Sequence, residues 1–246
     1  GQASDVPQAL HEKLRDMVNL AHTLKKRRHA RGSIDFDMPE TAFALDARGY
    51  PTDVRARNRG ESERVIEEFM LLANETVAQL ARATELPFLY RVHEKPEPES
   101  VQSLEAFLHG LGIRARMGSN PAPARFQQIL ADTEEREEAR LIKQVMLRSF
   151  QRAAYSEAPK GHFGLATQDY CHFTSPIRRY PDLTVHRMLK LLLAGDSEAF
   201  ARQERHMPEL ARHCSFCEQK AVLAERDADD LLKAHYMHRR LGEEFP

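Results

Sequence analysis

Apolar positions near the start of the chain follow the period of an amphipathic helix. Pro7 can open this helix, and Gly32 is expected to end it. Between them the apolar residues recur at intervals of three and four, at Leu10, Leu14, Met17, Ala21 and Leu24. The helix ends in a basic cluster formed by Lys25, Lys26, Arg27, Arg28 and Arg31. We predict a solvated helix end, because cations there complement the helix dipole, although contact with phosphates is the alternative.

A two-residue period replaces the helical one after Gly32. Residues 33–38 alternate between polar and apolar, which predicts a half-buried strand containing Ile34, Phe36 and Met38. A hairpin is predicted next, with strands at 43–45 and 50–54 around a turn that contains a glycine. On the first strand, Asp35 and Asp37 share the polar face. No third ligand is evident, so we favour a solvated face over a metal site.

A second amphipathic helix is predicted from about Ser62 to Thr84. Its expected core stripe consists of Ile66, Phe69, Met70, Ala73, Val77 and Leu80. Glu67 and Asn74, seven residues apart, lie along the flank of this stripe, whereas Glu68 points away from it. A carboxylate and an amide at the boundary of a buried face need hydrogen-bond partners.

Helical patterns dominate the remainder of the chain. We predict a short helix at 101–111 and a charged helix at 134–153 that turns Ile142, Val145, Met146 and Phe150 inward. A loop with a short strand follows at 155–166, and the pattern is helical again from 198 to 240. The expected fold class is therefore α+β, rich in helix, with small hairpin and strand elements.

The stretch HFTSPIRRYPDLTVHRML, residues 172–189, has the features of a helix start that binds an anion. A proline at 176 suits the first helical position, so Thr174 and Ser175 are candidate N-caps. Arg178 and Arg179 add fixed positive charge beside the positive end of the dipole, and the planar arginine fork suits phosphate.

Two alternatives to this interpretation stay open. One arginine of the pair is at the right spacing to form an ion pair with Asp182, one turn further on. Pro181 would also interrupt a helix that began at Pro176, because proline removes a backbone hydrogen bond. In that case the helix starts only at Pro181.

Composition narrows the class of protein. The 246 residues carry 36 basic and 37 acidic side chains, for a net charge of −1, so any contact with nucleic acid must come from a local patch. The chain is long enough for one large domain, and it contains neither a signal peptide nor an apolar run of the roughly 20 residues that span a bilayer. We expect a cytoplasmic protein without a membrane partner.

The cysteines argue against a disulfide framework because they are odd in number: Cys171, Cys214 and Cys217. Cys214 and Cys217, with His213 beside them, offer only one of the two ligand pairs that a structural zinc site usually has. We therefore favour helical cysteines packed as small apolar groups over a metal site.

The stretch at 172–189 also resembles the C-terminal signature of the RNB family of exoribonucleases, which includes ribonuclease II and ribonuclease R. Further blocks resemble that family in the same order, and the likeness is greatest to the ribonuclease R branch. These blocks are GSIDFDMPE (32–40), RVIEEFMLLAN (64–74), FLYRVHEKP (88–96), GHFGLA (161–166) and AERDADDLL (224–232). They run nearly from end to end of the chain.

The resemblance implies that residues 1–246 form the C-terminal half of an RNB catalytic domain. The family's cluster of aspartates, which holds magnesium ions, precedes the block at 32–40 and is absent from this chain. Mg²⁺ is therefore expected in the intact enzyme, with ligands outside this chain. The implied partners are single-stranded RNA, the N-terminal half of the domain and OB-type RNA-binding domains. Alone, the chain is expected to be inactive.

The resemblance also implies roles for particular residues. Arg178 would stabilise charge on the phosphoryl oxygens in the transition state, while Thr174, Ser175 and Arg179 would contact the RNA beside it. Arg179 is alternatively paired with a carboxylate.

Three further roles concern the rest of the RNA. Phe36 would stack on a base near the 3′ end, with a core phenylalanine as the alternative. Glu67 would recognise ribose hydroxyls, with a helix-packing hydrogen bond as the alternative. Glu225 would influence RNA release, unless it belongs only to a charged helix face.

The function implied by the resemblance is processive 3′-to-5′ hydrolysis of single-stranded RNA to nucleoside 5′-monophosphates. Water activated by two magnesium ions would attack the terminal phosphodiester in line. One alternative is a degenerate RNB relative that binds RNA or regulates without cutting. Another is a helical interaction module, favoured if Arg178 is tied to Asp182 and no basic cleft surrounds it.

Overall fold

The computed structural model describes residues 7–36, 40–57 and 59–244, and it confirms the predicted helix-rich α+β fold. Two antiparallel pairs of short strands, β1 with β2 and β3 with β4, are the sheets of the described residues. In chain order the elements are α1 (Gln8–Ala30), β1 (Glu40–Leu45), β2 (Pro51–Arg57), α2 (Glu61–Ala83), β3 (Tyr90–Val92), α3 (Pro98–Gly110), α4 (Pro123–Asp132), α5 (Ala139–Ser149), β4 (Ala154–Ser156), the 3₁₀ turn η2 (Phe163–Leu165), α6 (Tyr180–Ala194), α7 (Ser197–Glu204) and α8 (Met207–His238).

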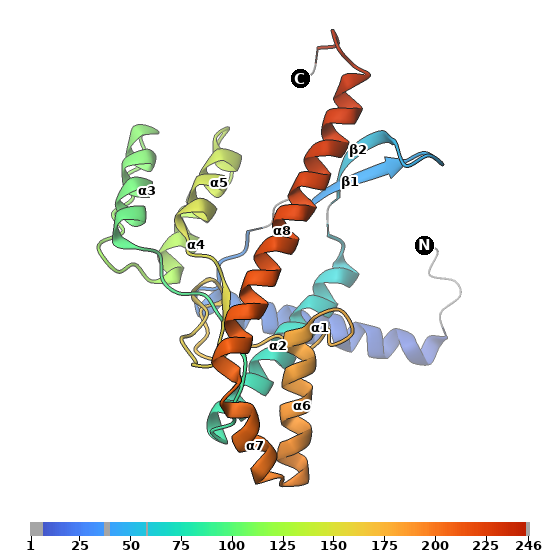
Figure 1. Cartoon of the computed structure of the whole chain (residues 1–246). Coiled ribbons are helices and arrows are strands. Elements are labelled where there is room, and N and C mark those ends of the chain that lie inside the picture. The colour runs from blue at the N-terminus through green and yellow to red at the C-terminus, as the bar shows by residue number, and fades with distance from the viewer. Residues whose placement is uncertain (1–6, 37–39, 58, 245–246) are drawn as a thin grey trace.

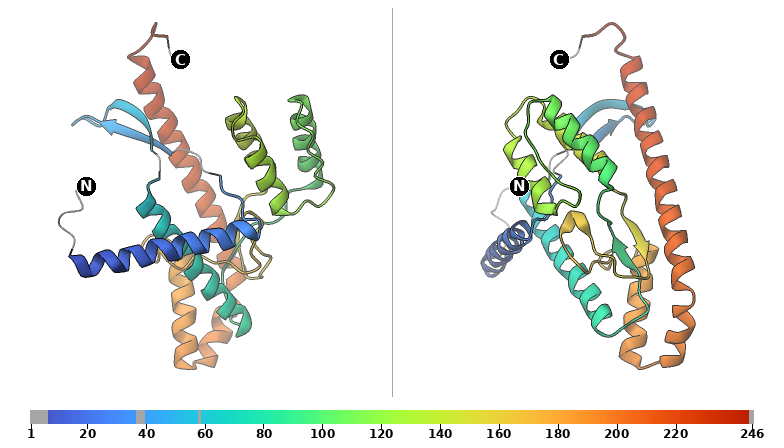
Figure 2. Two further views of the ribbon diagram at one scale, coloured as in Figure 1. Left: turned by 180° about the vertical axis from the view of Figure 1, so that it is seen from behind. Right: turned by 90° about the vertical axis from the view of Figure 1, so that its left-hand side faces the viewer.

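The long helix α8 runs through most of the length of the molecule (Figure 1). Its N-terminal part packs on β4, and its C-terminal part meets β2 of the hairpin. Helices α6 and α7 lie at one end, while α3, α4 and α5 form a separate group, as the turned views also show (Figure 2). Helix α1 packs across α2, which places the C-terminal end of α1 near the middle of the molecule.

Two hydrophobic clusters hold these parts together. The first lies between α2, the β3–β4 pair, α6 and the start of α8, and it includes Phe88 and Met188. The second lies among α3, α4 and α5 and includes Phe126 and Met146. All four side chains are almost fully buried, and burying each contributes about 1.5–3 kcal/mol of transfer free energy.

The predicted hairpin is confirmed, whereas the prediction of a strand before it is wrong. Strand β1 pairs antiparallel with β2, and Gly49 in the turn has a φ of +79°. Residues 33–36 form no strand. Ile34 instead donates its N–H to the carbonyl of Gly164 (2.8 Å), so this backbone is satisfied by a loop distant in sequence. Asp37 and Met38 lie outside the described residues.

The second predicted helix is confirmed as α2, but its buried face is rotated from the expected stripe. Ile66 and Leu80 are exposed. The buried positions are Val65, Glu68, Asn74, Glu75, Ala78 and Ala81. The expectation that Glu68 points away is therefore wrong. Polar residues turn inward here because Arg28 of α1 and Arg31, just after its C-terminal end, are ion-pair partners for Glu68 and Glu75.

Three other helices differ from expectation. The charged helix begins at Ala139 rather than Glu134, with Ile142 and Met146 inward as predicted. Helix α4, which the sequence did not indicate, precedes it. The C-terminal helical pattern is broken between α7 and α8, where Pro208 sits in the first turn of α8.

Among the described residues, none of the helices combines the length and apolar character that crossing a membrane requires. Apolar side chains do reach the surface on the N-terminal part of α1, where Leu10, Leu14 and Leu20 are each nearly half exposed.

Candidate nucleic-acid interface

The arginine-rich motif forms a turn and not the first turn of a helix. Helix α6 begins at Tyr180 with Arg179 in the N-cap position, so the assignment of Thr174 and Ser175 as N-caps is wrong. The carbonyl of Ser175 instead accepts the N–H groups of Arg178 (3.3 Å) and Arg179 (3.0 Å). Pro181 excludes a helix across this segment, since its ring would meet the carbonyl four residues earlier. The alternative start at Pro181 is confirmed to within one residue.

The two adjacent arginines have different surroundings. Arg179 donates from Nη2 to Oδ2 of Asp182 (2.9 Å), and Asp182 is fully buried. The same oxygen accepts the backbone N–H of Ser175 (2.7 Å). Arg178 is exposed, and its side chain makes no hydrogen bond or ion pair within the described residues. The ion pair foreseen as an alternative thus uses Arg179, which leaves the Arg178 guanidinium available to an anion.

Two helices fix the chain just before this turn. Asn74 of α2 accepts the N–H of Phe173 at Oδ1 (3.0 Å) and donates from Nδ2 to the hydroxyl of Tyr170 (3.1 Å). His186 of α6 stacks flat on the Phe173 ring, with centroids 4.3 Å apart, and its Nε2 lies 2.9 Å from the Phe173 carbonyl. The prediction that Asn74 needs partners is confirmed, and its partners belong to the motif.

A row of rings lies behind the motif. His93, His162, Tyr170, His172 and Tyr155 follow one another with centroids between 5.1 and 6.0 Å apart. Burial, reinforced by nearby positive charge, lowers the pKa of His162 and His172 to about 3, so both rings are neutral near pH 7. The sequence shows its histidines as scattered. Only the fold brings these three into one row.

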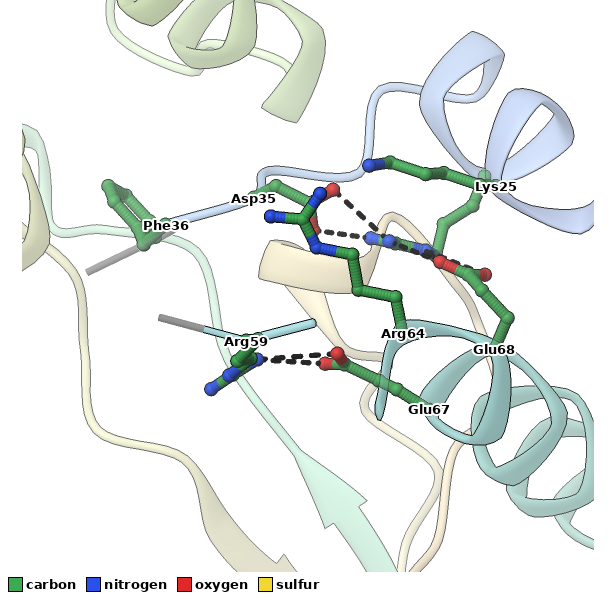
Figure 3. A pocket seen from close by; sticks show the side chains of 8 residues that line it. Lys25, Asp35, Phe36, Arg59, Arg64, Glu67 and Glu68 are labelled. Atoms are coloured by element: carbon green, nitrogen blue, oxygen red, sulfur yellow. Dashed lines mark hydrogen bonds and ion pairs between the residues drawn. The ribbon is translucent and has the colours of Figure 1, made fainter. Parts of the chain in front are cut away.

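A pocket gathers two of the predicted RNA-binding residues, Phe36 and Glu67 (Figure 3). Its lining is strongly charged and consists of Lys25, Arg28, Asp35, Phe36, Arg59, Arg64, Glu67 and Glu68. Phe36 is half-buried, and its ring meets Phe150 edge to face at 5.5 Å. Glu67 pairs with Arg59 at 3.2 Å, and both side chains are 45% exposed. The pocket therefore combines an aromatic ring, an accessible carboxylate and several cations.

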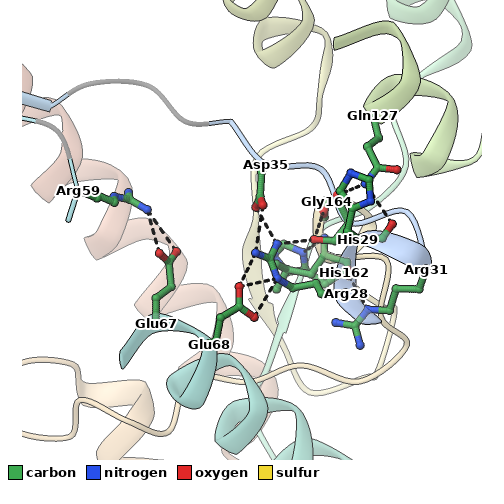
Figure 4. A network of polar contacts seen from close by, with 12 residues as sticks. Arg28, His29, Arg31, Asp35, Arg59, Glu67, Glu68, Gln127, His162 and Gly164 are labelled. Carbon is green, nitrogen blue, oxygen red and sulfur yellow. Dashed lines mark hydrogen bonds and ion pairs between the residues drawn. The ribbon is translucent and has the colours of Figure 1, made fainter. Parts of the chain in front are cut away.

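The floor of this pocket is a buried network around Arg28 (Figure 4). Arg28 is only 8% exposed and donates to Glu68 (2.7 Å), Asp35 (2.7 Å) and Ser33 (2.9 Å). Burial alone would lower the pKa of Arg28, but the hydrogen bonds to Glu68 and Asp35 outweigh it and raise the pKa above its ordinary value.

The prediction of a solvated basic helix end is right for Lys25, Lys26 and Arg27, which are exposed, and wrong for Arg28. Arg28 is buried, and Arg31 pairs with the buried Glu75. Lys25 lines the pocket instead. Because Arg28 holds Asp35, it also fixes the backbone beside Phe36.

Helix α2 connects the pocket with the motif turn. Glu67 and Asn74 are seven residues apart on this helix, a separation of about 10 Å along its axis. One end of that span faces the pocket, and the other holds the segment before Arg178. Helix α2 thus links the pocket, which contains Phe36 and Glu67, to the segment that precedes Arg178.

Glu225 and the cysteines lie apart from this region. Glu225 is exposed on α8 within a run of exposed residues, and within the described residues it neither lines the pocket nor contacts the turn. Cys171 and Cys214 are buried, whereas Cys217 is exposed, so packing as small apolar groups is right for Cys214 and wrong for Cys217. The described part of the chain contains no group of three or more His, Cys, Asp or Glu side chains that could hold a metal ion.

Comparison with known proteins shows that this chain is similar to RNB-domain proteins named Ribonuclease R. A family profile described as the RNB domain matches residues 1–195. A protein named Ribonuclease R from Aquifex aeolicus is 45% identical over 236 residues, which is 96% of this chain and 34% of that protein. A second Ribonuclease R, from Thermotoga maritima, is 42% identical over 93% of this chain and 33% of its own length.

A solved structure is similar as well. Mycoplasma genitalium RNase R in complex with ribose-methylated single-stranded RNA superimposes with a TM-score of 0.94 at 27% identity. The match covers 98% of this chain and 38% of that one. The chain thus spans about a third of the length of the curated relatives it matches.

Proposed function

This chain belongs to the RNB domain family, and we propose that it forms part of a cytoplasmic exoribonuclease that shortens single-stranded RNA from its 3′ end. The proposed products are nucleoside 5′-monophosphates. The observation that carries the proposal is Arg178, whose guanidinium is exposed and unpaired within the described residues on a turn braced from two helices. The choice of RNA as substrate is supported by the relatives of this chain that are named Ribonuclease R and by the RNA complex of one similar structure.

Arg178 suits the work of stabilising a phosphoryl group. Its planar guanidinium can offer two parallel N–H groups to two phosphoryl oxygens. As negative charge develops on those oxygens during hydrolysis, a fixed cation lowers the barrier more than it stabilises the bound substrate. Arg179 takes no part in this step, because Asp182 already neutralises it.

The pocket suits the nucleotide at the RNA end. Phe36 offers a ring on which any base can stack, an interaction worth roughly 1–3 kcal/mol and tolerant of sequence. Glu67 offers a carboxylate acceptor for a ribose hydroxyl, the group that distinguishes RNA from DNA. Its present pair with Arg59 is exposed, and such pairs contribute only about 0–1 kcal/mol, so exchange for a ribose hydroxyl costs little.

The described residues do not fit a magnesium pair. Of the three carboxylates that line the pocket, Asp35 and Glu68 both bind Arg28, which leaves only Glu67, paired with Arg59. These residues therefore do not hold the metal in the proposed reaction. We propose that the intact protein depends on magnesium, with ligands supplied by sequence outside this chain. The OB-type RNA-binding domains are proposed to lie in that outside sequence as well.

A cleavage assay tests the proposal. Purified chain is incubated with 5′-labelled single-stranded RNA and Mg²⁺, alone and with the N-terminal half of the catalytic domain, beside an intact protein that contains this chain. We expect shortening from the 3′ end with the intact protein and on complementation, and none with the chain alone. Shortening by the chain alone would show that the metal ligands lie within it. An intact protein that binds RNA without cutting it would favour the non-catalytic alternative.

A further inference from the structure

We propose that Asp182 is a positioning residue for Arg178, and this inference rests on the proposed function. Asp182 is a fully buried carboxylate at the start of α6. A buried carboxylate is costly unless it is paired and hydrogen-bonded, so its partners indicate its role. They are the side chain of Arg179 and the backbone N–H of Ser175, and both belong to the turn that carries Arg178.

One carboxylate oxygen closes the turn at both ends. Oδ2 of Asp182 accepts from Ser175 N–H at 2.7 Å and from Arg179 Nη2 at 2.9 Å. The Ser175 carbonyl in turn accepts the N–H groups of Arg178 and Arg179. The backbone of Ser175 and the side chain of Arg179, on either side of Arg178, are thereby fixed to a single buried atom. Arg178 has no comparable side-chain partner within the described residues, so its direction depends on this backbone.

The charge of Asp182 also separates the roles of the two arginines. Two unpaired cations side by side would repel each other. Because Asp182 neutralises Arg179 in the interior, the exposed charge at this turn belongs to Arg178. Asp182 therefore sets both the direction of Arg178 and its isolation as a cation.

The same place holds unusual buried atoms. Among the described residues, the buried side-chain polar atoms without a hydrogen-bond partner are Thr174 Oγ1, Arg179 Nε and Asp182 Oδ1. Orphaned buried groups are rare and concentrate where function constrains the structure. The Arg179–Asp182 pair thus has one hydrogen bond, from Nη2 to Oδ2, where a bidentate pair would have a second. Oδ2 also accepts from the turn backbone, and the second hydrogen bond of the ion pair is not formed.

The test uses Asp182→Asn in an intact protein that contains this chain. Asparagine keeps an oxygen for Ser175 N–H and loses the charge that holds Arg179. We expect kcat to fall roughly 10- to 100-fold with little change in KM, the size of loss that a displacement of about 1 Å produces. In an Arg178→Lys background the same substitution should lower the single-turnover rate by less than about 3-fold, because its effect passes through Arg178.

Asp169→Asn is the matched control. Asp169 is also a buried aspartate paired with an arginine, Arg82 at 3.2 Å, but it is not part of the turn. This variant should lose stability while keeping kcat. An equal loss of kcat in both variants, or additive losses with Arg178→Lys, would overturn the inference, because Asp182 would then act only through general stability.

A second pair of variants tests the same inference if Asp182→Asn does not fold. Arg179 uses only one N–H toward Asp182, so Arg179→Lys should keep kcat within about 3-fold, whereas Arg179→Met should lower it as Asp182→Asn does. Loss of kcat in Arg179→Lys equal to that in Arg179→Met would overturn the inference.

Amide hydrogen exchange separates this inference from the proposed function. In this chain, Asp182→Asn should speed exchange at Arg178 and Arg179 relative to Asp169→Asn, whatever the activity. An inactive intact wild type would refute the proposed function alone. Unchanged exchange at the turn would refute the positioning role alone.

Discussion

Removing the Arg28 guanidinium is expected to destabilise the fold severely. In Arg28→Met the side chain keeps much of its apolar bulk, but Glu68 loses its partner. The Glu68 side chain is only 6% exposed, so the carboxylate cannot turn to water. Asp35 is 49% exposed on its side chain and can be hydrated, so its loss adds little.

The magnitude follows from the burial of Glu68. Leaving one member of a buried ion pair without its partner costs about 3–5 kcal/mol. A domain has a total stability of about 5–15 kcal/mol, so the loss is a large part of it. In Arg28→Met/Glu68→Met neither charge remains, and the double variant should be more stable than Arg28→Met. The two substitutions are therefore expected to be strongly non-additive.

Urea denaturation followed by circular dichroism measures these free energies of unfolding. Lys160→Met is the control, since it breaks a pair with Glu94 of 2.8 Å in which both side chains are about half exposed, and it should cost at most about 1 kcal/mol. If Arg28→Met cost no more than Lys160→Met, or if its effect added to that of Glu68→Met, the buried network would not stabilise the fold as argued.

Four further outcomes are expected. In the intact protein, Arg178→Lys should lower single-turnover cleavage by orders of magnitude with much less effect on RNA affinity, because lysine lacks the planar fork; near-normal cleavage would remove Arg178 from catalysis. Phe36→Ala should weaken RNA binding by roughly 1–3 kcal/mol. Because Phe36 is half-buried, the same variant should cost less stability than the roughly 3–5 kcal/mol of a core phenylalanine, which thermal melting measures. Glu67→Ala should reduce the preference for a ribose over a deoxyribose 3′ end, and an unchanged ratio would count against the ribose role. Finally, the pKa values of His162 and His172 are about 3 in the folded chain, below the ordinary 6.5. As the pH falls, these histidines therefore take up protons in the unfolded chain at a higher pH than in the folded chain. Stability should be highest above pH 6.5 and fall toward pH 3, by up to about 1.4 kcal/mol per pH unit for each histidine. Urea midpoints across that range test this, and a flat profile would contradict it.

Local patterns in the sequence predicted the elements whose formation depends on neighbouring residues alone. The hairpin follows from alternation around a glycine turn, and α1 and α2 follow from their helical periods. The phase of α2 was not predictable in this way. Pattern analysis places Glu68 outside, because the arginine that makes its burial favourable lies 40 residues earlier in the chain.

The motif shows the same limit at the site. Spacing correctly indicated an arginine–aspartate pair without saying which arginine forms it, and the family resemblance named Arg179 as a candidate for a carboxylate pair, which the structure bears out. Two prolines five residues apart compete to start the helix, and the outcome depends on the buried partners of Asp182 and Asn74. Both sets of partners come from the fold, so spacing alone cannot reveal them.

The contacts of Asn74 have a consequence for the order of folding. Asn74 reaches Tyr170, Cys171 and Phe173 across 96, 97 and 99 residues. Closing so long a loop costs entropy before any contact rewards it, so such contacts form after helices and hairpins. Contacts absent from the folding transition state govern the rate of unfolding and not the rate of folding. The Asn74 contacts that brace the segment before Arg178 are thus expected to form late in folding, and their loss should mainly speed unfolding.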